Sequence, residues 1–159
     1  MKKFIASTVF VILFTVSLFA ADQNPQPSIL GIKLGMKEKA VRKLLQKIGK
    51  QQKEEKKEEE EEGGEEEIWL LTGNSKYDSL IVGFDRKHLV RYVSVFAEKN
   101  KNGVRYSEIG DLKSARFEGN PSNYRYTWDM PAKGKVPRYL VIARGIDKQY
   151  LTSYSIKKL

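Results

Sequence analysis

The side chains that could carry out catalysis are few in this sequence. His88 is the only histidine among 159 residues, and there is no cysteine. The candidate nucleophiles of a Ser–His–Asp arrangement are Ser79 and Ser94, and its candidate acids are Asp78 and Asp85. No nucleophile-elbow pattern surrounds either serine. A zinc site built from a histidine and cysteine cluster cannot be formed. His88 is expected on a solvated hairpin turn.

Other kinds of reactive or ligand-binding pattern are also missing. The glutamates lack the Asp/Asn/Gly spacing of a calcium loop, and no glycine-rich phosphate loop follows a predicted strand. Acidic residues are rare in the regions that predict strands, which disfavours the paired carboxylates of a glycosidase. We therefore expect a protein that is not an enzyme and that binds no cofactor or metal.

The most chemically distinctive stretch is 124–130, YRYTWDM, where aromatic and basic residues alternate. With the arginines that flank the next predicted strand, it gives six candidate interaction residues: Tyr124, Arg125, Tyr126, Trp128, Arg138 and Arg144. Basic side chains interleaved with aromatic ones can bind single-stranded nucleic acid by stacking and charge. The alternative is an aromatic core stripe of period two with solvated arginines on the other face. Both interpretations stay open, the core stripe being slightly favoured.

The charge distribution favours anionic partners. The formal net charge is +9, and it becomes +13 when the first three residues and the acidic segment 50–67 are set aside. Such a surface favours phosphorylated lipid headgroups, acidic glycans or an acidic protein. Nucleic acid is not expected, because the N-terminus predicts export.

The N-terminus has the layout of a secretory signal peptide. Lys2 and Lys3 precede Phe4–Ala20, which has no charge, and the polar sequence ADQNPQP follows. Cleavage after Ala20 is preferred, giving a signal peptide over 1–20; an uncleaved anchor helix is the alternative. Without cysteine there is neither a disulfide nor a lipid anchor, so a periplasmic or secreted protein is expected.

The first half of the mature chain predicts a helix followed by three strands. After a Pro-rich lead-in over 21–28, Met36–Ile48 places its apolar residues on one stripe, and Gly49 follows where a helix C′ residue belongs. Short turns between the strands indicate an antiparallel meander. The expected strands are Ile68–Thr72, Leu80–Phe84 and His88–Ala97.

An acidic segment over 50–67 lies between the helix and the first strand. It holds ten Glu and four Lys and no apolar side chain. We predict a solvated low-complexity insertion, with Glu54–Glu67 lacking a fixed structure. Two alternatives remain for this segment: an acidic arm that stays near the basic surface, and a loop that contacts no other part of the protein.

The second half repeats this plan with a shorter helix over Ile109–Gly119. With Trp69 aligned on Trp128, residues 81–84 fall on 140–143 without a gap. Two unrelated meanders are the alternative, because the match in residue identity is thin. The second set of expected strands is Tyr124–Met130, Arg138–Ala143 and Tyr150–Ile156.

These patterns predict an α+β fold with one domain over 29–159. Its first unit covers 29–99 and its second covers 104–159. Each unit is expected to be a helix plus a three-stranded meander, and the two meanders are expected to form one antiparallel sheet with the helices on one face.

The chain resembles a known family at this level. It is similar to the motif of the SmpA/OmlA small outer-membrane-assembly lipoproteins, with Leu34-Gly35-Met36 opening a helix, Val41 and Leu44-Leu45 on its buried face, and Phe84-Asp85 before a turn. In the second unit, Gly119-Asn120-Pro121 before Tyr124–Trp128 resembles the family's glycine-x-proline lead into its first strand. The chain is also similar to the tandem-repeat β-lactamase inhibitor proteins. Lys37 replaces the family's capping Ser, the lipidated Cys is absent, and the acidic insertion is foreign to the pattern.

The resemblance implies a non-enzymatic protein whose sheet face or loops bind another protein. We therefore expect an exported envelope protein that binds another envelope or secreted protein, as an assembly factor or inhibitor-like module. A basic module binding anionic lipid or glycan is the alternative, and an envelope hydrolase is the third. A monomer or weak oligomer is expected.

Overall fold

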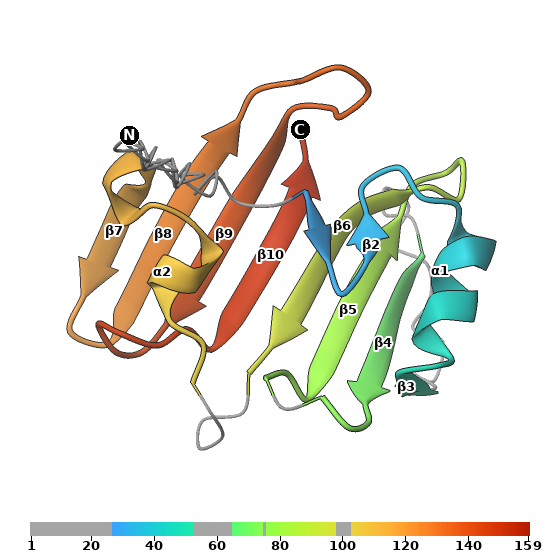
Figure 1. Ribbon diagram of the computed structural model, residues 1–159, viewed down its shortest axis with the longest axis horizontal. Helices are drawn as coiled ribbons and strands as arrows, with labels where there is room; N and C mark the ends of the chain where they lie inside the picture. The colour runs from blue at the N-terminus through green and yellow to red at the C-terminus, as the bar shows by residue number, and fades with distance from the viewer. Residues whose placement is uncertain (1–26, 53–64, 75, 98–102) are drawn as a thin grey trace, which may run out of the picture.

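The computed structural model describes residues 27–52, 65–74, 76–97 and 103–159. The predicted signal peptide lies outside the described residues, as do most of the lead-in and 53–64 of the acidic insertion. The described chain forms one eight-stranded antiparallel sheet and a separate two-stranded hairpin (Figure 1). The strand order in the large sheet is β3-β4-β5-β6-β10-β9-β8-β7.

The strands account for most of the regular structure. They are β1 (Ser28–Ile29), β2 (Ile32–Lys33), β3 (Gly49–Gln52), β4 (Glu66–Leu71), β5 (Ser79–Phe84), β6 (Val90–Phe96), β7 (Arg116–Asn120), β8 (Asn123–Met130), β9 (Tyr139–Gly145) and β10 (Ser153–Lys158). The helical elements are α1 (Glu38–Leu45), α2 (Tyr106–Ile109) and the 3₁₀ turn η1 (Leu112–Ser114). The six predicted strands are present, with bounds shifted by up to three residues.

The predicted α+β class is wrong, because this is a mostly-β protein with only two short α-helices among the described residues. The helix predicted over Met36–Ile48 is shortened at both ends to α1. Lys37 is extended and its side chain makes no capping hydrogen bond, so the helix begins at Glu38. Gly49 belongs to β3 and does not cap the helix. The first unit contributes β3 to β6 to the large sheet and the second contributes β7 to β10, so each unit has four strands there, not three.

The helix predicted over Ile109–Gly119 is also wrong. One turn of helix, α2, ends before Gly110, whose backbone is extended, and the chain then forms η1 and strand β7. Phe117 explains the difference, because it lies opposite Tyr126 in the sheet and its ring packs on that tyrosine. In a helix this aromatic side chain would have had little apolar surface to join.

The acidic insertion is shorter than predicted. Gln51 and Gln52 pair with β4, and Glu66 and Glu67 belong to β4. Glu67 is buried, with 3% of its surface exposed. The prediction that the segment up to Glu67 has no fixed structure is therefore wrong at its C-terminal end, and deletion of 51–66 would remove parts of two paired strands.

The core lies on one face of the sheet. In Figure 1, α2 lies in front of β8 and β9, and the β1–β2 hairpin crosses in front of β6 and β10. Val41 and Leu45 of α1, Ile32 of the hairpin and Tyr106 of α2 are all buried in one apolar cluster with the inward side chains of the strands. The described helices and the hairpin thus cover the same face.

The two strand sets join through β6 and β10, which pair antiparallel at the centre of the sheet. Trp69 of β4 lies opposite Leu80, and Trp128 of β8 lies opposite Val141, so the two tryptophans occupy corresponding places. The gapless alignment predicted from the sequence is wrong beyond that point. From Trp128 to its cross-strand partner the chain is two residues longer than from Trp69 to Leu80.

Candidate interaction surface

The face of the sheet that points away from the helices carries more apolar side chains than a solvated face usually does. Side chains alternate along each strand, so the neighbours of the core residues point to this second face. Seven of them are apolar and at least partly exposed to solvent. They are Ile68, Leu70, Ile81, Tyr92, Phe96, Leu140 and Ile142. We call this side of the sheet the open face.

Two arginines lie next to each other on the open face. Arg125 of β8 is directly opposite Arg144 of β9. Like charges directly opposite each other destabilise a sheet. Glu118 of β7 lies on the other side of Arg125, with 3.4 Å between Oε2 and Nη1. Arg144 makes no ion pair with a described residue, so the pair keeps an excess of positive charge.

Arg125 is also incompletely bonded. Its Nε is buried and has no hydrogen-bond partner within the described part of the chain. Ile142 lies two residues before Arg144 on the same strand and is half-buried, so the open face has an apolar position next to the arginine pair. A carboxylate that approached this pair would neutralise the repulsion and could be bound by two planar donors at once.

The aromatic half of the predicted set lies on the opposite face. Trp128 is 2% exposed, and its indole Nε1 donates a hydrogen bond of 2.9 Å to the carbonyl oxygen of Asp111. The ring centroid of Tyr126 lies 4.8 Å from that of Tyr106 in α2. Tyr124 follows the same stripe. The structure thus separates these three aromatics from Arg125 and Arg144.

Arg138 is occupied by a neighbour. Its Nε and Nη2 donate to the two carboxylate oxygens of Asp129, at 3.0 Å and 2.5 Å. This two-pronged hydrogen bond from Arg138 lowers the pKa of Asp129 below its ordinary value. Arg138 therefore belongs to an exposed ion pair at the start of β9 and does not join the Arg125–Arg144 pair.

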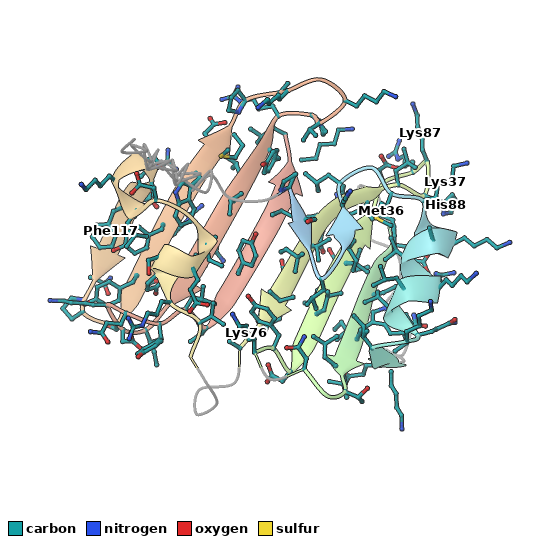
Figure 2. The ribbon with its side chains drawn as sticks, viewed as in Figure 1. Met36, Lys37, Lys76, Lys87, His88 and Phe117 are labelled. Carbon is teal, nitrogen blue, oxygen red and sulfur yellow. The ribbon has the colours of Figure 1, made fainter. Side chains whose placement is uncertain are left out.

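A second polar cluster surrounds His88, on the turn between β5 and β6. Figure 2 shows His88 beside α1, with Lys37 and Lys87 close by. The His88 ring Nδ1 lies 2.6 Å from Glu38 Oε2, and its side chain is 72% exposed. The backbone of His88 has φ of 56°, an uncommon conformation for a residue with a side chain. Asp85 stabilises this turn by accepting hydrogen bonds from the backbone N–H groups of Lys87 and Leu89.

One group of metal-ligating side chains occurs among the described residues, in this cluster. Glu38, Glu65 and His88 bring one ligand atom each to within 4.8 Å of one another. Arg42 lies among them, with Nη1 2.6 Å from Glu38 and Nη2 3.0 Å from Glu65. Its guanidinium forms ion pairs with both carboxylates, so the cluster is an ion-pair network that connects α1 to β4 and the turn.

The buried part of this network is Glu67. It accepts hydrogen bonds from Arg42 Nε and, at 2.9 Å, from the indole Nε1 of Trp69. Burial disfavours the charged guanidinium of Arg42, but the hydrogen bond that it donates to Glu67 and the charges of the three nearby carboxylates outweigh burial, so the pKa of Arg42 is raised. Sequence reasoning treated Glu67 as part of a solvated tract and missed this contact.

Sequence reasoning also missed β7. The alternation in 116–126, where Phe117, Tyr124 and Tyr126 are separated by polar residues around a Pro-containing turn, is the pattern that predicts a hairpin. The hairpin was not predicted because part of this stretch was assigned to the second helix, over Ile109–Gly119.

Comparison of the chain with protein-family models, with curated proteins and with solved structures gave no match. The resemblance to the outer-membrane-assembly lipoproteins and the inhibitor proteins therefore stays a prediction. No helix within the described ranges is long and apolar enough to cross a membrane.

Proposed function

We propose that this protein is an exported, non-enzymatic module that binds another envelope or secreted protein through the open face of its sheet. The observation that carries the proposal is the Arg125–Arg144 pair, with its unneutralised charge, beside exposed apolar side chains. One face of an antiparallel sheet can be solvated, but it then normally carries polar side chains. Isoleucines and aromatics on such a face favour a covering partner.

The same combination favours a protein as the partner. A protein segment can offer carboxylates to the arginines and apolar side chains to Ile81 and Ile142 at once. The pair would then be desolvated, which strengthens its hydrogen bonds to a carboxylate. The proposed partner therefore has an acidic patch beside an apolar one.

The experiment compares the wild-type protein with the double variant Arg125→Ser/Arg144→Ser in pull-downs from an envelope fraction. Lys133→Ser/Lys135→Ser is the matched control, because it removes the same charge from an exposed loop. We expect a band that is retained by wild type and control, is weakened at least tenfold by the double variant, and partly persists at high salt. Equal capture by all three proteins would contradict the proposal.

The alternative is binding of an anionic lipid or glycan, favoured by the formal charge of +9. Vesicles containing acidic lipid and immobilised heparin test it directly. Binding that disappears steeply with salt, and that falls equally in the double variant and the lysine control, would favour this alternative over a packed protein interface.

A further inference from the structure

Strand β7 forms one edge of the large sheet. It pairs with β8 on one side, and no described strand pairs with its other side. All five of its residues are exposed. Such an edge presents backbone N–H and C=O groups that can pair with another strand.

Phe117 at the centre of β7 is 51% exposed. Its ring packs along the sheet, with its centroid 4.9 Å from that of Tyr126 and 6.2 Å from that of Tyr124 (labelled Phe117 in Figure 2). It also lies over Gly119, where an added Cβ would come within 2.5 Å of the ring. The glycine thus leaves space for the ring, and the outer half of the aromatic side chain faces solvent.

The charges on β7 are self-complementary. Arg116 and Glu118 flank Phe117 and point to the open face, with 3.1 Å between Arg116 Nε and Glu118 Oε1. If two copies of β7 pair antiparallel about Phe117, Arg116 lies opposite the partner's Glu118, and the reverse pair is the same by symmetry. Opposite charges in cross-strand positions stabilise a sheet.

This register also suits the other side chains. Phe117 would lie opposite the partner's Phe117, so their exposed ring surfaces would be buried against each other. Ala115 would lie opposite the partner's Gly119, and these small residues leave room for the two rings. Registers centred on Glu118 or on Arg116 would instead place two like charges opposite each other.

We propose that two copies of this chain associate edge to edge through β7, in antiparallel register centred on Phe117. The dimer is two-fold symmetric, and its sheet is continuous. The helices of both copies lie on one side, because an antiparallel edge pairing keeps the same face of each sheet together. The two Arg125–Arg144 pairs then lie on one extended open face. This inference does not depend on the proposed partner.

Sedimentation velocity over a concentration series tests the register. Arg116→Glu gives a strand with two acidic residues, and Glu118→Arg gives one with two basic residues, so each variant repels its own copies. We expect each to dimerise at least about tenfold more weakly than wild type. An equimolar mixture restores attraction at both pairs, and we expect heterodimers that approach wild-type affinity. Lys133→Glu, an exposed loop change of equal charge, should leave the affinity unchanged.

Thermal unfolding of each variant shows whether it is folded. Glu118→Arg loses the ion pair with Arg125 and places a like charge opposite it, so we expect this variant to lower the midpoint more than Arg116→Glu does. A wild-type protein that stays monomeric at the highest concentration overturns the proposal. The proposal is also overturned if wild type dimerises and both variants dimerise equally well. It is overturned too if the equimolar mixture of the variants fails to form heterodimers.

Cross-linking gives a second readout. The chain has no cysteine, so Phe117→Cys introduces a single thiol at the proposed axis. Directly opposite residues in antiparallel strands have Cα atoms about 4.5–5.5 Å apart, within the range for a disulfide. We expect oxidation to yield a covalent dimer much faster than Lys133→Cys does. Equal rates for the two variants would contradict the register.

Discussion

Ser94 and Ser155 lie opposite each other on β6 and β10, with their hydroxyl oxygens 2.8 Å apart. The neighbouring core pairs are Val93 with Ile156 and Val95 with Tyr154. The strand order on either side of this junction is the same, which gives the sheet an approximate two-fold axis near the serine pair. The serines satisfy each other's hydroxyl groups at a part-buried position on the open face, so the two halves join without an unpaired polar group there.

Glu67 is expected to contribute substantially to stability. Glu67→Gln removes the charge that faces Arg42 and leaves one acceptor oxygen for two donors, since Trp69 also donates to this side chain. Leaving a buried donor unsatisfied costs roughly 1–3 kcal/mol. Because Arg42 is 38% exposed and can be solvated, we expect about 2 kcal/mol of lost unfolding free energy, measured by urea denaturation.

Glu65→Gln is the matched control, because Glu65 contacts the same arginine but is 54% exposed. Exposed ion pairs contribute about 0–1 kcal/mol. If Glu65→Gln proves as costly as Glu67→Gln, the buried contact is not what stabilises this region.

Six of the eight strands in the large sheet were predicted, and β7 has a local hairpin pattern that was assigned to a helix. Only β3, at the other edge, could not be predicted from its own residues. Strands such as Leu80–Phe84 and Tyr124–Met130 are rich in β-branched and aromatic residues between turn signals, so local pattern decides them. β3 contains only Gly, Lys and Gln, and forms because Gly49–Gln52 pairs with β4. Residues with no strand propensity of their own can form a strand by pairing with an existing one. The partner strand β4 is distant in the sequence, so the local pattern around β3 does not reveal it.

The candidate site was predicted in part. Period-two alternation in 124–130 separates Tyr126 and Trp128 from Arg125, and the structure places the aromatics in the core stripe. That Arg125 faces Arg144 depends on the register between β8 and β9, which the loop over 131–138 sets. The contact between Glu67 and Arg42 depends on where α1 crosses the sheet, which no spacing in the sequence specifies.

Asp85 should make stability depend on acid pH. The backbone N–H groups of Leu89 and Lys87 donate to its carboxylate and lower its pKa in the folded state. A lowered folded pKa gives stability that is present above the unfolded value of 3.8 and is lost as pH falls through the folded value. Asp85→Asn keeps an acceptor oxygen but loses the negative charge that strengthens these hydrogen bonds. We therefore expect the variant to be less stable than wild type at pH 7. We expect this difference to shrink below about pH 4, as measured by urea unfolding across pH. A difference that stays constant with pH would contradict this role.

Tyr106 should contribute a dependence on alkaline pH. Burial, reinforced by the nearby Asp147, raises its pKa to about 12 from the ordinary 10.0. A raised folded pKa gives stability that is complete below pH 10 and is lost as pH rises toward the folded value, because the unfolded tyrosine ionises first. Tyr106→Phe removes this ionisation, so its unfolding free energy should fall less than that of wild type between pH 10 and pH 12. Other buried tyrosines keep some of the slope, and an unchanged slope in the variant would exclude Tyr106 as a contributor.

Gly145 and Gly83 provide a matched test of where the sheet tolerates an added methyl group. An added Cβ at Gly145 would come 2.4 Å from the carbonyl oxygen of Tyr150 and 2.3 Å from the hydroxyl oxygen of Tyr106. The first of these contacts is with backbone, so Gly145→Ala requires the chain after β9 to shift, at a cost of about 1–3 kcal/mol. At Gly83 the three atoms nearest to the added one all belong to the ring of Tyr92, a side chain on the open face that can move more easily than backbone. We therefore expect Gly83→Ala to lower the urea midpoint much less than Gly145→Ala, and the reverse order would mean that Tyr92 is held in place.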